Sequence, residues 1–368
     1  MEEDLVKAKR YRRVKEAVFF AGLAANLVAL AWMQFSGLSS KLKDLALTVT
    51  RQPSAAAALY SACFFCLLFA ALLPLDFYSG FALEKRFGLS AQPLGRWVAD
   101  ALKKFTLSLI LFTFTATALL TFIDRFPRIW WVVAGLGWLG LTLFLARILP
   151  RFIIPLFYRT HPLPAGPLKD AILSLCQRAG VRVIDIYEIL FSKKTKKANA
   201  ALVGIGGSRR VLLADTLLEH FTPAEIEMVV AHELGHHVKK HIGRAFVFNA
   251  LAVFSGFYLL QAVSGALVAF FGAEGLADLR IFPSLVFLSS AGSLILFPLQ
   301  NAFSRWQENE ADAYALATMP RKDVFVSLMR KLSRQNLSDP DPGRWTEFLL
   351  YDHPSTANRI RHAEKILS

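Results

Sequence analysis

Residues 54–75 read SAAAALYSACFFCLLFAALLPL, a run of twenty-two residues without an acidic or basic side chain. About 20 apolar residues are the length of one α-helix across the hydrocarbon core of a bilayer. Only helices and closed barrels satisfy every backbone hydrogen bond in that environment, so this run predicts a transmembrane helix. This run decides the fold class, because five further runs are also apolar and uncharged.

These five runs also lack charged residues and approach or exceed the length of a spanning helix; they cover about 17–35, 105–123, 129–146, 245–272 and 281–303. Composition agrees, since 54% of the 368 residues are hydrophobic and three cysteines exclude a disulfide-rich scaffold. We therefore predict a multi-span α-helical integral membrane protein with six crossings. A shorter apolar segment at 150–158 contains Pro150 and Pro155 and is interpreted as an interfacial extension of the fourth helix, with a seventh crossing as the alternative.

The net charge of +14 bears on partners and orientation. In a soluble protein it would suggest nucleic acid, whereas in a membrane protein it is typical of basic loops that face anionic lipid. We therefore expect membrane lipids, and no nucleic acid, as partners. The N-terminal tail and the second connection together carry eleven Lys and Arg residues, against six in the connections on the opposite side. The positive-inside rule then predicts that the N-terminus, residues 159–243 and the C-terminus are cytoplasmic.

Changes in composition divide the chain into four segments. The first holds four N-terminal spans with the interfacial extension, the second is polar, the third is a transmembrane hairpin and the fourth is a cytoplasmic C-terminal segment; they cover 1–158, 159–243, 244–303 and 304–368. In the polar segment, a helical pattern near 168–179 precedes apolar runs that predict strands at 181–190, 198–205 and 210–213. The turn Gly206-Gly207-Ser208 predicts a hairpin, and Thr222 before Pro223 predicts a helix start.

The helix that follows contains AHELGH at 231–236. His232 and His236 are four residues apart, so both imidazoles project from one face and can bind a single Zn²⁺ ion. Glu233 lies beside them, where it can act as general base toward the water that the metal activates. Val229, Val230 and Ala231 make the preceding turn apolar, as a desolvated catalytic helix requires.

A catalytic zinc needs a third protein ligand. Ile242 and Lys239 occupy the positions where metzincins have His and Gly, and the spans hold no Asp of the kind used by site-2-type intramembrane proteases. After the sixth span comes SRWQENEAD at 304–312, in which Glu308 and Asp312 share a helix face. One of the two can bind zinc while the other orients a ligand His. Glu310 is expected to point elsewhere into solvent, and His237 and His241 are expected off the ligand face, solvated or facing headgroups.

HELGH at 232–236 and SRWQENEAD at 304–312, separated by a transmembrane hairpin, resemble the type I CAAX prenyl endopeptidases and their bacterial relatives, and more distantly the HtpX-type membrane proteases. The resemblance spans about 75–365 and includes FYSGFALEKRFGLSAQ at 77–92. It implies a zinc ion held by His232, His236 and Glu308, with Asp312 behind the ligands and Glu233 as base. It further implies that Asn199 and Ala200, on an edge strand, hold the substrate backbone, and that His353 and Arg359 approach the polarised carbonyl.

The resemblance also implies a cytoplasmic α+β zincin-like metalloprotease layer on a helical barrel around a water-filled chamber. The expected activity is zinc-dependent endoproteolysis of prenylated CAAX-type peptides, or of membrane-associated and misfolded proteins in quality control. The expected location is a bacterial inner membrane, or the endoplasmic reticulum or inner nuclear membrane in a eukaryote. No feature predicts an obligate protein partner. The alternative function is that of a transporter or scaffold with a degenerate metal site.

Overall fold

The computed structural model describes residues 2–204 and 206–367, so residues 1, 205 and 368 of the predicted segments lie outside the described part. Within that part, six helices are long and apolar enough to cross a membrane, which confirms the predicted fold class. They are longer than the uncharged runs that predicted them: α1 (Glu2–Phe35), α3 (Pro53–Phe77), α5 (Leu94–Arg125), α6 (Trp130–Ile148), α11 (His241–Phe271) and α12 (Phe282–Thr318). A shorter helix, α2 (Leu38–Val49), follows α1.

Two of the long helices continue through π-helical turns. The turn at Tyr78–Ala82 joins α3 to α4 (Leu83–Arg86), and the turn at Leu149–Ile153 joins α6 to α7 (Ile154–Phe157). Trp130–Phe157 is therefore one continuous candidate span. Residues 150–157 continue the fourth helix, as predicted, and the described residues contain six candidate spans by length and composition.

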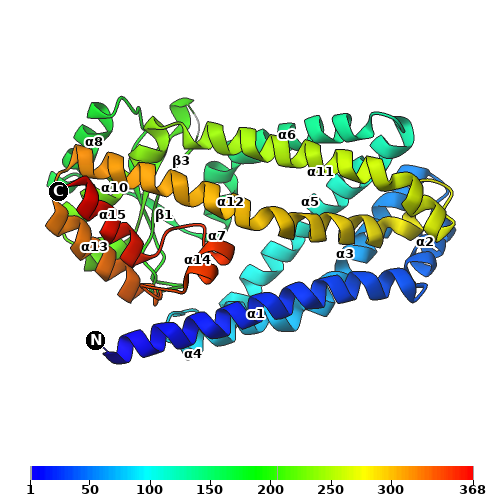
Figure 1. Cartoon of the computed structure of the whole chain (residues 1–368), viewed down its shortest axis with the longest axis horizontal. Helices are drawn as coiled ribbons and strands as arrows, with labels where there is room; N and C mark the ends of the chain where they lie inside the picture. Colours follow the sequence, from blue (N-terminus) through cyan, green and yellow to red (C-terminus); the bar gives the residue numbers. More distant parts are fainter. Residues whose placement is uncertain (1, 205, 368) are drawn as a thin grey trace.

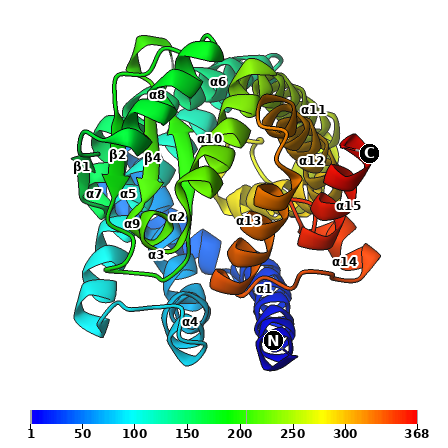
Figure 2. The same ribbon diagram turned by 90° about the vertical axis from the view of Figure 1, so that its left-hand side faces the viewer.

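A four-stranded sheet with six helices forms one end of the molecule, here called the globular layer. Its strand order is β1-β2-β4-β3. The strands β3 and β4 pair antiparallel, which confirms the predicted hairpin, while β2 pairs parallel with β4. Seen from this end, α10 lies between the sheet and the helices α12, α13 and α15 (Figure 2). The elements are β1 (Thr160–Pro162), α8 (Pro167–Arg178), β2 (Ile186–Ile189), β3 (Ala200–Val203), β4 (Arg210–Ala214), α9 (Asp215–His220), α10 (Pro223–Val238), α13 (Lys322–Gln335), α14 (Arg344–Leu350) and α15 (Thr356–Ile366).

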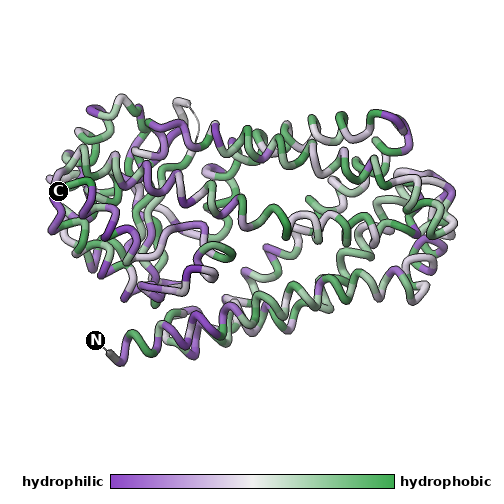
Figure 3. The backbone as a smooth tube through the Cα atoms, viewed as in Figure 1, coloured by the Kyte–Doolittle hydropathy of each residue, from purple (hydrophilic) through white to green (hydrophobic). Residues whose placement is uncertain are grey.

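The core of the globular layer joins the sheet to the helices on both sides of α10. Ile186 and Leu213 from the strands pack in one buried cluster with Ile226 and Val230 of α10 and Phe325 of α13. In contrast, the long helices keep most apolar side chains on the outside, as helices facing lipid do. In the 18-residue apolar stretch of α11, 0% of the residues are buried. Hydropathy follows this division: apolar segments dominate the long helices and polar ones gather in the globular layer (Figure 3).

Helix α12 belongs to both regions. Its 37 residues make a rod of about 55 Å at 1.5 Å per residue, well beyond the ~30 Å hydrocarbon core. It runs without a break from the far end of the molecule into the globular layer (Figure 1). The predicted segment boundary at 303/304 therefore falls inside one helix, and the last turns of that helix carry the SRWQENEAD motif.

The first turns of α1 also lie against the globular layer. The Nζ of Lys197 is 3.1 Å from the Tyr11 Oη and 3.0 Å from a Glu84 carboxylate oxygen, and Arg12 pairs with Asp339 at 3.1 Å. Both chain ends consequently lie at the same end of the long helices as the globular layer (Figure 1).

Candidate metal centre

Helix α10 begins at a capping box and packs closely on α12. The Thr222 side chain accepts from the Glu225 N–H, and the Glu225 carboxylate accepts from the Thr222 N–H at 2.8 Å, which confirms the predicted helix start. Further along, Gly235 faces α12 so closely that a Cβ there would lie 3.0 Å from the Cα and the carbonyl oxygen of Ala311. The missing side chain of Gly235 thus lets the two helices approach and brings the two sequence motifs together.

His232, His236 and Glu308 converge at this contact. The Nε2 atoms of the two imidazoles are 3.2 Å apart, and the Glu308 oxygens lie 3.3 Å from His232 Nε2 and 3.2 Å from His236 Nε2. One ligand atom from each residue lies within 4.8 Å of the others. Glu308 is buried, and its Oε2 atom has no hydrogen-bond partner among the described residues. Two imidazole nitrogens and a buried carboxylate, whose Oε2 lacks a hydrogen bond among the described residues, form a set of ligand atoms that fits a divalent cation such as zinc.

Electrostatics also favour a cation here. Desolvation alone would lower the pKa of His232, but the hydrogen bond to Asp312 and the adjacent Glu308 carboxylate outweigh that effect and raise the pKa to about 9. A buried carboxylate beside two imidazoles therefore attracts positive charge, which a metal ion supplies in place of a proton.

Asp312 lies behind His232, on the side away from Glu308. Its Oδ1 is 2.8 Å from His232 Nδ1, and its side chain is fully buried. The Arg359 Nε donates to Asp312 Oδ2 at 2.8 Å. The guanidinium thus contacts Asp312 behind His232, and its Nη2 lies 3.4 Å from His232 Nδ1. Its approach to a substrate carbonyl, which the family resemblance implies, stays a prediction.

His353 also approaches Glu308. Its Nε2 is 3.4 Å from Glu308 Oε1, and its Nδ1 is 2.9 Å from Asp352 Oδ1. The hydrogen bond to Asp352 raises the pKa of His353 above its usual value, despite partial desolvation. The protonated form of this exposed imidazole is therefore favoured beside the three converging side chains.

Glu233 is half-buried, and its carboxylate has no hydrogen bond to any described residue. Asn199 is exposed immediately before β3, and its side-chain oxygen accepts from the Ala200 N–H at 2.9 Å. The preceding residue, Ala198, is held by Asn336, whose side-chain oxygen accepts from the Ala198 N–H at 2.9 Å. Because β3 is the last strand in the sheet order and contacts α10, an edge of the sheet lies next to the helix that carries the histidines.

The expectation for His241 was wrong, because its side chain is buried rather than solvated. Glu310 lies outside the three converging side chains, as expected, and is 27% exposed, but it is paired. The His241 side chain is 3% exposed, and its Nδ1 is 2.9 Å from His236 Nδ1. Glu310 pairs with His241 Nε2 at 3.1 Å and also with Arg244. Helical spacing misplaced His241 because Lys240 has a left-handed backbone, φ 59°, which ends α10 and turns the chain back before α11. No residue pattern marks this turn, since a lysine rarely adopts that conformation.

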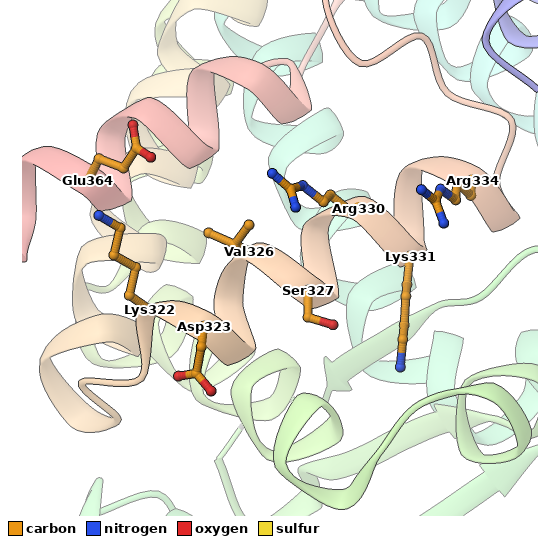
Figure 4. A pocket seen from close by; sticks show the side chains of 8 residues that line it. All are labelled: Lys322, Asp323, Val326, Ser327, Arg330, Lys331, Arg334 and Glu364. Carbon is orange, nitrogen blue, oxygen red and sulfur yellow. The ribbon is translucent and has the colours of Figure 1, made fainter. Parts of the chain in front are cut away.

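A surface hollow of about 910 Å³ lies on α13, and none of the three converging side chains lines it (Figure 4). Its lining includes Lys331, which pairs with Glu225 at 2.7 Å. This side chain helps to hold the start of α10 against α13, and the hollow is separate from the metal centre.

Comparisons with known proteins agree with this geometry. The model of peptidase family M48 matches residues 162–367, and that of the "CAAX prenyl protease N-terminal, five membrane helices" matches residues 1–159. In that second range, four of the described helices meet the length and composition of a span. The "Uncharacterized metalloprotease YhfN" of Bacillus subtilis is 32% identical over 98% of this chain and 86% of its own length.

Two yeast proteins are similar over nearly the whole chain. "CAAX prenyl protease 1" of Saccharomyces cerevisiae is 29% identical over 98% of this chain and 85% of its own length. The crystal structure of S. mikatae Ste24p superposes with a TM-score of 0.86 at 26% identity, covering 99% of this chain and 89% of that one.

Proposed function

The chain belongs to peptidase family M48 and is a membrane-embedded metalloendopeptidase, and from that premise we propose that its metal is zinc, held by His232, His236 and Glu308. The observation that carries the proposal is the convergence of one ligand atom from each side chain within 4.8 Å, with the buried Oε2 of Glu308 left without a hydrogen bond among the described residues. When bound, the metal supplies Lewis acidity, which lowers the pKa of a water molecule to about 7 and polarises the scissile carbonyl.

Around the metal, the proposed roles follow from contacts. Glu233, which has no hydrogen-bond partner among the described residues, takes the proton of the attacking water. His353, whose Nε2 lies 3.4 Å from Glu308 Oε1 and whose protonated form is favoured, stabilises the oxyanion that develops on the carbonyl. Asp312 holds the orientation of His232 through Nδ1, and Arg359 holds Asp312. We also expect Arg359 to add positive charge near the site.

Glu233→Gln tests the catalytic mechanism. The variant should keep its zinc, because both imidazoles and Glu308 remain, and lose about 10²–10⁴-fold in peptide hydrolysis, the usual contribution of a general base. The measurement is zinc content together with the rate on an unstructured protein substrate. Retention of more than about a tenth of the activity, far above that range, would exclude Glu233 as the base.

We propose that the substrate binds as an extended strand along β3, beside Asn199 and Ala200. The support is the free edge of β3 in contact with α10, since an extended peptide pairs readily with such an edge. Two substrate classes fit: prenylated CAAX-type peptides, suggested by the name of the yeast relative, and membrane-associated or misfolded proteins. Purified enzyme assayed on a farnesylated CAAX peptide, its unprenylated counterpart and an unstructured protein separates them.

We propose that the globular layer faces the cytoplasm, of a bacterial inner membrane if the source is bacterial. The basic residues of the N-terminal tail support this side, and the contacts of Lys197 with Tyr11 and of Asp339 with Arg12 keep the tail next to the layer. In a background lacking Cys63, Cys66 and Cys176, exposed positions changed by Lys193→Cys and, separately, Glu3→Cys should resist an impermeant thiol reagent until the membrane is opened. Labelling of either position in sealed cells contradicts the assignment.

A further inference from the structure

His236 has a partner of its own on the side away from Glu308. Its Nδ1 faces His241 Nδ1 at 2.9 Å, and His241 Nε2 faces the Glu310 carboxylate at 3.1 Å. These contacts form a chain of three side chains that starts at α12, passes through the first residue of α11 and ends on α10. The His241 side chain is 3% exposed, so water competes little for either of its ring nitrogens.

The proton positions in this chain follow from Glu310, because its carboxylate can only accept hydrogen bonds. An ionised carboxylate only accepts hydrogen bonds, so the proton of neutral His241 lies on Nε2, facing Glu310. The Nδ1 atom of His241 then carries a lone pair and accepts from the Nδ1–H of His236. As a result, the Nε2 lone pair of His236 is free. This Nε2 lies 3.2 Å from Glu308 Oε1 and 3.2 Å from His232 Nε2.

Neighbouring contacts hold Glu310 and His241 in place. Arg244 pairs with Glu310, which favours the ionised carboxylate and fixes its position beside His241. The side-chain amide of Gln307 donates to the His241 carbonyl at 3.4 Å and ties the start of α11 to α12. His237, by comparison, lies one residue after the ligand and makes no hydrogen bond to any described residue.

We propose that His241 and Glu310 are positioning residues, which set the tautomer and ring orientation of His236 so that its Nε2 can bind the metal. The inference rests on the proposed role of His236 as a ligand. Outer partners of this kind typically contribute about 10–100-fold to metal affinity. With these roles, the membrane hairpin of α11 and α12 contributes His241 and Glu310 to the metal centre in addition to the ligand Glu308.

The experiment measures Zn²⁺ affinity of the detergent-purified full chain by competition with a chelator, and the visible absorption spectrum of the Co²⁺-loaded protein. His241→Phe keeps a flat ring but accepts no hydrogen bond, so we expect about 10–100-fold weaker Zn²⁺ binding and a shifted Co²⁺ spectrum. Glu310→Ala should weaken binding in the same direction, and Glu310→Gln should restore it, because the amide oxygen still accepts from His241 Nε2. His237→Ala is the matched control and should leave both readouts unchanged.

The double variant His241→Phe with Glu310→Ala tests whether Glu310 acts through His241. It should bind Zn²⁺ within about twofold of His241→Phe alone, the usual error of additivity. Independent, additive losses would overturn the proposed chain, as would unchanged affinity and spectrum in His241→Phe. Thermal unfolding identifies a variant that has lost its fold. If His241→Phe has done so, the Zn²⁺ affinities of Glu310→Ala and Glu310→Gln are compared instead, and equal affinities overturn the proposal. Failure of the wild type to bind Zn²⁺ would instead contradict the ligand assignment itself.

Discussion

The two histidines proposed as ligands contact different supporting side chains on the far side of each imidazole ring. His232 is held by Asp312, which is fully buried, and by Arg359 of α15, whose side chain is 14% exposed. His236 is held by His241, and behind it stand Glu310 and Arg244, whose side chains are 27% and 40% exposed. Both supports use a carboxylate of α12, but the first is completed by Arg359 of α15 in the globular layer, and the second by His241 and Arg244 of α11, which continues into the membrane.

This difference has an electrostatic consequence. An ion pair in a buried, low-dielectric position interacts more strongly, and costs more to break, than one that water reaches. An exposed pair is typically worth about 0–1 kcal/mol. The support of His232 should therefore be the more rigid and the more costly to lose, whereas that of His236 should be softer and more sensitive to ionic strength.

The largest effect should come from Glu308, which touches both histidines. Glu308→Ala removes the shared ligand, so Zn²⁺ binding and peptide hydrolysis should both be lost whichever support remains. Metal content and activity of the purified variant measure this. Glu364→Ala, an exposed carboxylate on α15, is the control and should retain both. A Glu308→Ala protein that still holds stoichiometric zinc would mean that another side chain is the third ligand.

The second prediction compares the two supports directly. Asp312→Ala should weaken Zn²⁺ binding at the upper end of about 10–100-fold, and Glu310→Ala at the lower end, because only Asp312 is fully buried. Asp312→Ala also leaves Arg359 buried without its carboxylate, which costs stability. Adding Arg359→Met should therefore recover thermal stability without recovering affinity. The reverse ranking of the two alanine variants would contradict the comparison.

The third prediction concerns the contact that both supports require. Gly235→Ala places a Cβ 3.0 Å from the Ala311 backbone and should separate α10 from α12, at a cost of about 1–3 kcal/mol typical of overpacking. The unfolding temperature and the Zn²⁺ affinity should fall together. Gly243→Ala is the matched control, since a Cβ there meets nothing within 4 Å and alanine favours helix.

The smallest effect lies at the start of α10, outside both supports. Burial alone would raise the pKa of Glu225, but hydrogen bonds from Lys331, Thr222 and Ser327 outweigh it and hold the pKa below its ordinary value of 4.5. The folded state therefore gains stability from ionised Glu225 above about pH 4.5 and loses it as pH falls through the lowered pKa. Glu225→Gln should be less stable than wild type at pH 7 by about 1 kcal/mol, with the gap narrowing in acid. Thermal unfolding across pH measures this, and a gap that widened in acid would contradict it.

Local patterns were enough to predict most of the fold. The six spans follow from uninterrupted apolar runs, and the β3–β4 hairpin and the start of α10 follow from turn and cap residues a few positions apart. The parallel pairing of β2 with β4 did not follow, because it depends on how α8 and the rest of the globular layer pack. The π-helical turns that extend α3 and α6 likewise carry no pattern that we recognised.

The metal centre was predicted as far as helical periodicity reaches. His232, Glu233, His236 and Glu308 lie on helices whose registers the spacing indicates, and the structure brings the three ligand candidates together. His241 was missed because periodicity stops at the left-handed Lys240. The pairing of Arg359 with Asp312 was also missed, because it joins α15 to α12, and no local pattern relates two helices so far apart in the chain.

The unbroken course of α12 limits which changes in chain length the protein can tolerate. One residue inserted between Pro298 and Glu308 would turn everything after it by about 100° and shift it by about 1.5 Å along the axis. The Glu308 carboxylate would then face away from both imidazoles, although every residue of the motif would still be present. An insertion in the connection between α11 and α12 would leave that register intact. Gain and loss of residues over generations should therefore accumulate in that connection and stay out of the rod.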